Sequence, residues 1–260
     1  KEFARKSMGD SWGAKDHLTW ILPPERGASF YSTGGLVAVH ADRLERNEIY
    51  DSLYEREVYA TSGERILLWF NLIKDNKEIP MGRELSSSEN PKFEVRALGS
   101  FKQLPGCPDY VNNTMKKEEI ERLCLNECYN PSNERNLIDR IEVVKIKPTL
   151  YLNALQEVIE DPWLVLECED KGQGCSVAFE DKEFTKDETN SVYYVRAIQE
   201  ETLAVGGDPL RCEYNDKGEC IKIRPCYASG PDFEPSDDCL APIGERAWSS
   251  PIFLNYINQS

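Results

Sequence analysis

The order of apolar and polar residues predicts strand, helix and strand early in the chain. Leu36–Val39 is a short apolar run behind two glycines, residues 57–61 are rich in β-branched and aromatic side chains, and residues 66–72 are apolar except for Asn71. Each run is typical of a strand. Residues 49–54 place apolar side chains at helical spacing, which predicts about two turns of helix with one buried face. A strand, a helix and another strand within so few residues indicate a βαβ-like unit.

A second pattern begins at Lys92, where strand follows strand at irregular spacing. Within residues 139–147 the alternation predicts that Ile141 and Val143 face inward and Lys145 faces outward. Residues 162–167 and 175–180 are expected to form a strand pair. The remaining expected strands are residues 92–101, 191–199 and 247–256, with one helix at 114–126. This order favours an antiparallel β-sandwich of immunoglobulin-like type.

Together the two patterns predict an α+β chain of two domains. One βαβ-like unit cannot cover both faces of a parallel sheet, so residues 1–74 are interpreted as the terminal segment of an α/β domain that lies mostly outside this chain. Residues 75–91 are polar and carry proline and glycine, which predicts a linker. Residues 92–260 form the expected β-sandwich domain. The chain starts without methionine or an apolar leader, so we expect that something preceded it.

Four stretches of sequence resemble a known family. They are IYDSLYEREVYATSGERILLWF, GGLVAVHA, YYVRAIQEET and ERAWSSPIFL. They resemble the C-terminal part of an uncharacterised family of large secreted bacterial proteins, a domain of unknown function. That family is related to the polymerase-and-histidinol-phosphatase (PHP) type of metal-dependent hydrolase, most closely to carbamate-hydrolase-like members.

The resemblance implies a chemistry whose metal ligands are not in this chain. In the family, histidine, aspartate and glutamate residues upstream of the present sequence bind a divalent metal. Metal-activated water would attack a phosphoester or a carbamate or ester carbonyl. The resemblance therefore implies that this chain by itself has no cofactor and does not catalyse.

The charge of the chain narrows the range of partners. Its 260 residues carry 31 basic and 46 acidic side chains, a formal net charge of −15. This acidic balance argues against nucleic acid and against anionic membrane surfaces, because both are bound mainly through Lys and Arg. No apolar run approaches the roughly 20 residues that span a bilayer, so membrane insertion is not expected.

The cysteines indicate an oxidising compartment. The spacings predict three local disulfides, Cys168–Cys175, Cys212–Cys220 and Cys226–Cys239. A further bridge would join Cys107 to either Cys124 or Cys128 and leave one thiol over. Disulfides on this scale predict a periplasmic or extracellular protein.

Few residues are candidates for a catalytic or metal-binding role. His40 follows an apolar strand, where a metal ligand or an acid–base group of an α/β domain can lie, and it is a weak metal candidate beside the more ordinary reading of a structural histidine. His17 has Asp16 beside it, but neighbours in sequence do not by themselves make a site. Cys124 and Cys128 are better read as disulfide or structural thiols than as zinc ligands, since no second pair accompanies them.

Two functions are compatible with these patterns. The first is the C-terminal portion of a secreted metal-dependent hydrolase, whose partner is the missing N-terminal catalytic half or a second chain. The other is a non-catalytic extracellular β-sandwich that binds a protein or glycan or assembles with copies of itself. The packing of residues 1–72 distinguishes the two functions. Packing on a second chain that carries a cluster of histidine and aspartate favours the hydrolase, and packing only on the sandwich favours the binding module.

Overall fold

The computed structural model describes residues 34–124, 128–148, 158–169, 172–204, 207–208, 211–223 and 240–258. They divide into two compact units. We call the first the two-sheet unit, which comprises the described residues of 35–100, 134–200 and 245–260. We call the second the loop unit, which comprises the described residues of 34, 101–133 and 201–244.

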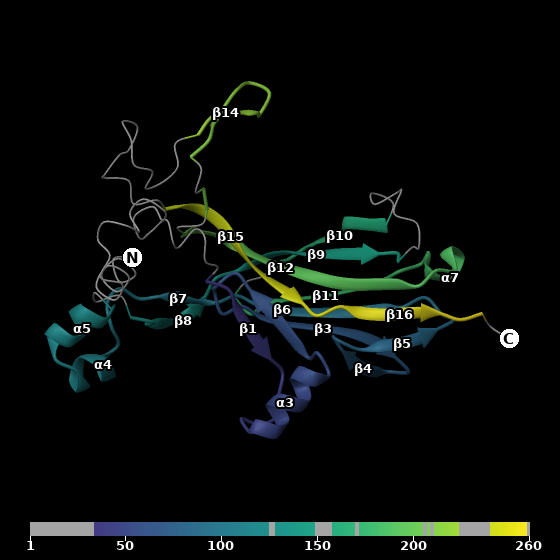
Figure 1. Ribbon diagram of the computed structural model, residues 1–260, viewed down its shortest axis with the longest axis horizontal. Coiled ribbons are helices and arrows are strands. Elements are labelled where there is room, and N and C mark those ends of the chain that lie inside the picture. The colour runs from purple at the N-terminus through teal and green to yellow at the C-terminus, as the bar shows by residue number, and fades with distance from the viewer. Residues whose placement is uncertain are drawn as a thin grey trace, which may run out of the picture. The chain divides into compact units, whose positions relative to one another are not determined.

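The larger of the two sheets has eight strands (Figure 1). Along the main path its order is β1-β2-β15-β12-β16-β5, and β9 pairs with both β12 and β10. Strand β12 is the longest and carries neighbours on both sides. The strands are β1 (Leu36–Val39), β2 (Val58–Thr61), β5 (Glu84–Ser87), β9 (Ile138–Ile146), β10 (Ile159–Glu167), β12 (Ser191–Ala204), β15 (Ala241–Ser249) and β16 (Ile252–Tyr256).

The smaller sheet has four strands in the order β11-β6-β3-β4. All three of its pairings are antiparallel. Its strands are β3 (Leu67–Lys74), β4 (Lys77–Pro80), β6 (Lys92–Leu98) and β11 (Cys175–Glu180), and the one-turn helix α7 (Phe184–Asp187) follows β11.

The inward faces of the two sheets share one hydrophobic core. Alternate residues of β3, β6, β9 and β12 are buried, as the period of two requires for a strand with one covered face. Phe93 stacks on Phe70 with ring centroids 5.4 Å apart and touches Tyr193 of the other sheet at 4.8 Å. The two-sheet unit is therefore a β-rich fold of two layers around an aromatic centre.

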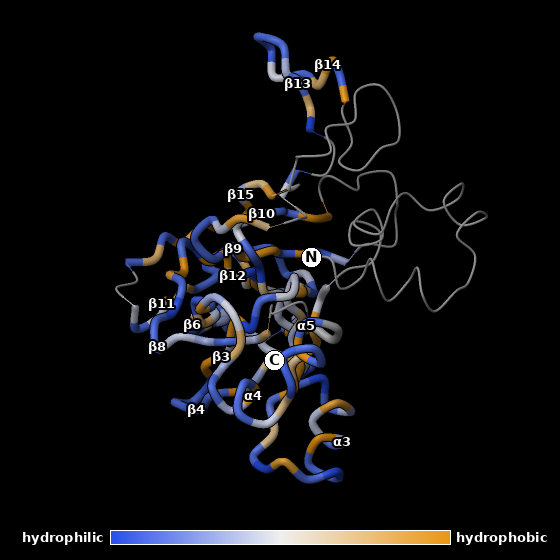
Figure 2. Tube along the Cα trace, turned by 90° about the vertical axis from the view of Figure 1, so that its left-hand side faces the viewer, coloured by the Kyte–Doolittle hydropathy of each residue, from blue (hydrophilic) through white to orange (hydrophobic). Residues whose placement is uncertain are grey.

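The first predicted segment folds differently from a βαβ unit. Strands β1 and β2 are antiparallel, with Leu36 opposite Thr61 and Val39 opposite Val58. The helix between them, α3 (Arg46–Tyr54), is a short excursion, and it buries none of its residues. The prediction of a βαβ-like unit is wrong because the chain reverses after α3 and returns beside the strand it left. The predicted burial of one helical face is wrong as well, and Figure 2 shows hydrophobic segments on the exposed α3.

Residues 36–74 are hydrogen-bonded into both sheets. Strand β2 pairs with β15, with Ala247 opposite Thr61, and β3 pairs with β6 along its length. This part of the chain completes the core: Leu68, Phe70 and Leu72 are all at most 4% exposed. It thus packs on the strands that follow Lys92.

Residues 75–91, predicted as a loop, contain β4 and β5. Strand β5 runs parallel to β16, with Glu84 opposite Phe253. The prediction of a wholly antiparallel sheet is therefore wrong at this edge. The sequence of β5 contains no hydrophobic run that would predict a strand. A polar four-residue strand is stable here because it lies at a half-exposed edge and pairs with one neighbour.

The strand pair predicted from residues 162–167 and 175–180 does not form. Strand β10 pairs with β9 in the large sheet and β11 pairs with β6 in the small one. The disulfide Cys168–Cys175 links the ends of these two strands across the layers, with a Cα–Cα distance of 5.5 Å. A bridge fixes only the ends of a loop, so it is compatible with two strands in different sheets.

The loop unit is built from short elements. These are β7 (Phe101–Gln103), α4 (Asp109–Thr114), α5 (Lys117–Cys124), β8 (Pro131–Arg135), β13 (Glu213–Tyr214) and β14 (Cys220–Lys222). Two helices replace the single predicted one, because Thr114 ends α4, where its hydroxyl donates to the Tyr110 carbonyl at 2.7 Å.

Two disulfides close loops in this unit. Cys107–Cys128 closes the loop that contains α4 and α5, and Cys212–Cys220 closes the β13–β14 hairpin. Three predicted bridges are thus confirmed, and the choice left open for Cys107 is resolved in favour of Cys128. The predicted Cys226–Cys239 bridge lies outside the described residues. Over the parts of the chain that are described, no helix is long and apolar enough to cross a membrane.

Candidate binding cleft

A cleft with a volume of about 390 Å³ and a mixed polar and apolar lining opens on the two-sheet unit. It lies where the end of β1, the start of β2 and the strands β3 and β4 meet. The lining residues are His40, Ala41, Asp42, Glu57, Trp69, Phe70, Asn71, Glu78, Pro80 and Met81.

The strand period places the polar side chains on this side. In β3 the buried residues Leu68, Phe70 and Leu72 alternate with Trp69, which faces the outside of the small sheet. Asn71 follows Trp69 on that face and is only 7% exposed. The β3–β4 hairpin sets Glu78 opposite Ile73 and so brings its carboxylate beside Asn71.

His40 is held by the backbone of β3. Its Nε2 donates to the Leu68 carbonyl at 2.8 Å, which leaves Nδ1 as the ring atom able to accept a hydrogen bond. The imidazole also lies against two aromatic rings, with centroid distances of 5.3 Å to Tyr59 and 5.7 Å to Trp69. Burial raises the pKa of the Tyr59 phenol, so this neighbour stays protonated at physiological pH.

Ion pairs hold two of the three carboxylates that line the cleft. The Arg83 guanidinium pairs with Glu57 and with Glu55. Glu78 accepts from the Asn71 amide and, at 2.7 Å, from Arg96. The third carboxylate, Asp42, is exposed in the segment that follows β1. The cleft therefore presents oriented polar groups whose positions are set by strand-borne partners.

Gly82 fixes the backbone beside the cleft. Its φ of +89° lies in the region that favours glycine, and a Cβ at this position would stand 2.4 Å from the Arg56 carbonyl oxygen. The Arg56 Nε in turn donates to the Gly82 carbonyl at 2.8 Å. This close backbone approach holds the start of β2 against the end of the β3–β4 hairpin.

Trp69 also lines a second hollow on the same outer sheet face. This hollow, of about 280 Å³, lies between Trp69, Arg96 and residues 173–176. Trp69 and Arg96 are directly opposite one another on β3 and β6. The indole ring therefore stands between two adjacent depressions, with an imidazole on one side and a guanidinium in the neighbouring strand.

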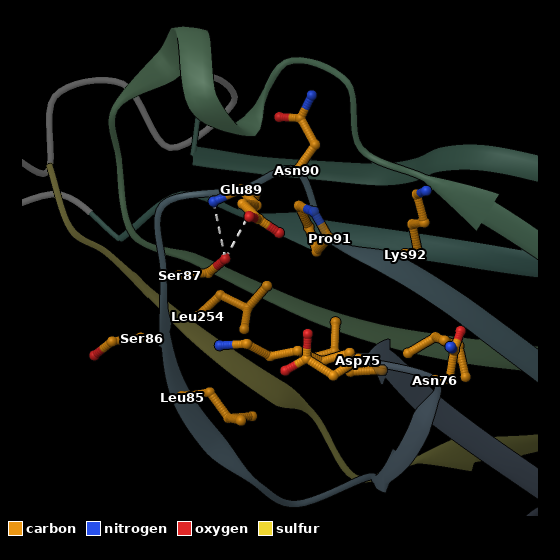
Figure 3. Close-up of a pocket in the computed structure, with 13 residues that line it drawn as sticks. Asp75, Asn76, Leu85, Ser86, Ser87, Glu89, Asn90, Pro91, Lys92 and Leu254 are labelled. Atoms are coloured by element: carbon orange, nitrogen blue, oxygen red, sulfur yellow. Dashed lines mark hydrogen bonds between the residues drawn. The ribbon is translucent and has the colours of Figure 1, made fainter. Parts of the chain in front are cut away.

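A third hollow, of about 220 Å³, lies at the other end of β3. The β3–β4 turn, β5 and residues 89–92 form its walls (Figure 3). Ser87 Oγ donates to the Glu89 carbonyl at 2.9 Å and accepts from its backbone N–H at 3.1 Å. These bonds close a local turn, and the hollow contains no aromatic ring or histidine.

The residues described here do not provide the metal site that the resemblance implies for the family. Within them, no group of three or more histidine, cysteine, aspartate or glutamate side chains is arranged to hold a metal ion. His40 has its Nε2 committed to the backbone, and His17 lies outside the described residues.

Sequence reasoning found His40 but missed most of its neighbours. Trp69 was visible only as one more apolar residue of a buried strand, because it stands in the apolar run Ile66–Phe70. Glu57 and Glu78 look like ordinary surface charges. The available signal was the period of two of a strand: if Leu68 and Phe70 face the core, Trp69 lies on the opposite face.

Comparison with known proteins finds a similar family, but the function of that family is unknown. Residues 23–78 match the model of the family described as "Protein of unknown function (DUF3604)". The segment includes β1, α3, β2 and β3, and all cleft-lining residues except Pro80 and Met81. The cleft therefore coincides with the part of the chain that is similar to this family.

Curated relatives are uncharacterised and much longer. An uncharacterised protein of Chlamydia muridarum is 33% identical over 87 residues, which is 34% of this chain and 12% of the relative. One from Chlamydia pneumoniae is 38% identical over 61 residues, 24% of this chain and 9% of the relative. No solved structure matches the chain. These matches support an uncharacterised domain family.

Proposed function

We propose that this chain is a non-catalytic β-domain of a larger exported protein and that it binds carbohydrate on the outer face of its small sheet. The observation that carries the proposal is the position of Trp69, which lines two adjacent hollows among side chains able to bond hydroxyl groups. Ligand sites typically combine an aromatic surface with a few oriented polar groups.

The chemistry of the cleft suits a sugar. An indole face offers a flat apolar surface on which the C–H face of a pyranose can stack. Asp42 and Glu78 offer carboxylate oxygens, which accept hydrogen bonds from hydroxyl groups, and Arg96 offers N–H donors. A chain of sugars that crosses Trp69 would reach both hollows, so an oligosaccharide fits better than a single ring.

The non-catalytic part of the proposal rests on the packing of residues 36–74. These strands complete the two-layer core, which favours a self-sufficient module. The immunoglobulin-like sandwich expected from the sequence belongs to the same proposal. Three disulfides support an extracellular or periplasmic location, since such bonds persist in oxidising compartments.

A binding assay on the 260-residue chain tests the proposal. We expect a screen of immobilised glycans to yield a ligand, and calorimetry to show that Trp69→Ala weakens its binding at least tenfold, about 1.4 kcal/mol. Tyr214→Ala removes another exposed aromatic ring, 64% exposed in the loop unit, and is the matched control that should bind normally. Absence of glycan binding by the wild-type chain, or equal binding by Trp69→Ala, would refute the proposal.

A second proposed function concerns the longer protein. The matched segments amount to only 9–12% of the relatives, which leaves room for a catalytic domain elsewhere in such a protein. By the resemblance, that domain would be a PHP-type metal-dependent hydrolase of phosphoesters, carbamates or esters. The missing catalytic part, or a second chain or copy, would then be the partner of the present domain, with no nucleic acid or membrane insertion involved.

Measuring the bound metal distinguishes the full-length protein from the 260-residue chain. We expect the full-length protein to retain a divalent metal and to hydrolyse a phosphoester or carbamate, and the 260-residue chain to do neither. Stoichiometric, tight binding of zinc, manganese or iron by the 260-residue chain would contradict its non-catalytic role.

A further inference from the structure

Two side chains of opposite charge meet in the core between the two sheets. Lys145 of β9 is 1% exposed and Asp181, directly after β11, is fully buried. The Lys145 Nζ and the Asp181 Oδ2 are 2.6 Å apart. Because β9 belongs to the large sheet and β11 to the small one, this contact joins the two layers.

The alternation of β9 was misassigned at this position. Lys145 continues the inward series of Ile141 and Val143, so the prediction that it faces outward is wrong. Its neighbour Val144 is buried too, which hides the period in the sequence. Lys145 thus enters the core as the next inward side chain of its strand.

The surroundings of the pair are aromatic. The Lys145 Nζ lies 5.4 Å from the Trp163 ring centroid. The Tyr193 hydroxyl, also fully buried, donates to Asp181 Oδ2 at 2.6 Å. Removing two charges from water costs several kcal/mol per ion, so converting the buried pair into an uncharged amide removes that cost.

We propose that Lys145 and Asp181 condense to an amide, an intramolecular isopeptide bond that links the two sheets covalently. The Nζ lone pair attacks the Asp181 Cγ, so the Nζ–Cγ bond forms. The Cγ–Oδ2 bond breaks, and this oxygen leaves as water with the two protons that the Lys145 ammonium gives up. Nothing is oxidised or reduced, and no co-reactant is needed.

The groups around the pair match the needs of this step. Asp181 Oδ1 accepts the backbone N–H of Glu183 at 3.0 Å, which would stabilise negative charge on that oxygen during attack. Tyr193 donates to Oδ2, the oxygen that leaves. Burial raises the pKa of Tyr193, so the phenol stays protonated and can donate its hydrogen bond to the leaving oxygen.

A base lies near the amine. Asp187 Oδ2 is 3.4 Å from the Lys145 Nζ and accepts from Lys147 at 2.7 Å. The hydrogen bond and charge of Lys147 lower the pKa of Asp187, which keeps this carboxylate ionised but makes it a weak base. Its position beside the Nζ is what lets it accept a proton from Lys145 during the attack.

The position of the pair supplies the driving force for condensation. Groups held in contact react with effective molarities of about 10⁵–10⁸ M, and the released water leaves an apolar interior. The product would keep the contact between the sheets after denaturation. The same residues without reaction would form a buried ion pair, which dissociates when the chain unfolds.

The intact mass of the denatured, disulfide-reduced wild-type chain tests the proposal without any variant. We expect the sequence mass less one water, about 18 Da. Proteolysis should then release one branched peptide that contains Lys145 and Asp181. The full sequence mass would overturn the proposal, and so would a water loss that maps to other residues.

Variants identify the reacting atoms. Lys145→Arg and Asp181→Ala should show no mass loss, whereas Asp181→Asn should give the wild-type product, since ammonia leaves in place of water. Lys186→Arg is the matched control, because this exposed lysine pairs with Glu183 outside the core, and it should keep the mass loss. Persistence of the mass loss in Lys145→Arg would contradict the assignment even if the wild-type mass agrees.

Asp187→Asn tests the base. It should slow the appearance of the crosslink after refolding, measured as the fraction of chain with reduced mass against time. Unchanged kinetics would remove Asp187 from the reaction.

Discussion

The two units bury very different amounts of hydrophobic side chain. In the two-sheet unit Phe70, Phe93 and Tyr193 are at most 1% exposed; Phe70 stacks on Phe93 within the small sheet, and Phe93 touches Tyr193 of the large one. In the described part of the loop unit only Ile120 and Ala241 are buried among the hydrophobic residues. Two of the three observed disulfides close loops in that unit. A unit with little core depends on covalent closure, as small extracellular domains do.

The function proposed for the two-sheet unit depends on this difference. A binding cleft needs polar groups that stay in place without bound ligand, and strands anchored in an aromatic core provide that. Trp69 and Asn71 belong to the strand whose other face carries Leu68, Phe70 and Leu72. We therefore expect the cleft to tolerate damage to the loop unit and to be sensitive to damage in the core.

Truncation of the aromatic core should have the largest effect. Phe70→Ala removes a fully buried ring and leaves a cavity, which should lower the free energy of unfolding of the two-sheet unit by about 3–5 kcal/mol. Tyr110→Ala, in the exposed face of α4, should change it by less than about 0.5 kcal/mol. Chemical denaturation monitored by tryptophan fluorescence measures both, and a loss below 1 kcal/mol for Phe70→Ala would contradict the proposed core.

Removal of a disulfide should affect the loop unit next. The Cys107–Cys128 bridge closes a separation of 21 residues, worth about 3 kcal/mol on the chain-entropy view. The double variant Cys107→Ser, Cys128→Ser should open residues 101–133 to limited proteolysis and leave the unfolding midpoint of the two-sheet unit unchanged. Equal destabilisation of both units would show that they do not depend on separate interactions.

The Cys168–Cys175 bridge offers the matched comparison. It lies in the two-sheet unit and closes a separation of only seven residues. Because strands β10 and β11 are also held by hydrogen bonds to β9 and β6, its removal should expose no new proteolytic site beyond the loop 168–175.

The smallest effect on stability should come from the ionisation of Glu245, a half-buried residue of β15. Burial raises the pKa of Glu245 above its ordinary value of 4.5, against the hydrogen bond from Ser62. The folded protein thus binds this proton more tightly than the unfolded chain does, so the contribution of Glu245 to stability falls as pH rises from 4.5 towards the folded pKa.

A glutamine at this position removes that dependence on pH. Glu245→Gln keeps a side-chain acceptor for Ser62 and should raise stability at pH 7 by about 0.5 kcal/mol, with a smaller gain at pH 4. Thermal unfolding at both pH values measures the change. A gain that is larger at pH 4 than at pH 7 would contradict the raised pKa.

The strands were largely predictable because their burial is one-sided. The apolar positions of residues 191–199 and 139–147 were sufficient to identify β12 and β9 as strands, although not to place Lys145, and the local cysteine spacings identified Cys168–Cys175 and Cys212–Cys220. Those signals are local, since they depend on the strand period or on a short loop.

Partners across the sheets were not predictable in the same way. The antiparallel return of β2 beside β1 and the parallel β5–β16 pair depend on contacts between distant residues, which no local period encodes. Lys145 was misplaced for a related reason. A charged residue is normally assigned to the exposed face, and the burial of Lys145 depends on carboxylates that come from a distant part of the chain, Asp181 and Asp187.

Hydrogen–deuterium exchange on the 260-residue chain tests the central claim that residues 36–74 belong to the same module as the strands after Lys92. We predict that the backbone amides of β3 exchange as slowly as those of β6, β9 and β12, because all four strands unfold together with the shared core. Fast exchange throughout residues 36–74, beside slow exchange in β9 and β12, would contradict the account. It would instead support the assignment of residues 1–74 to a separate α/β domain.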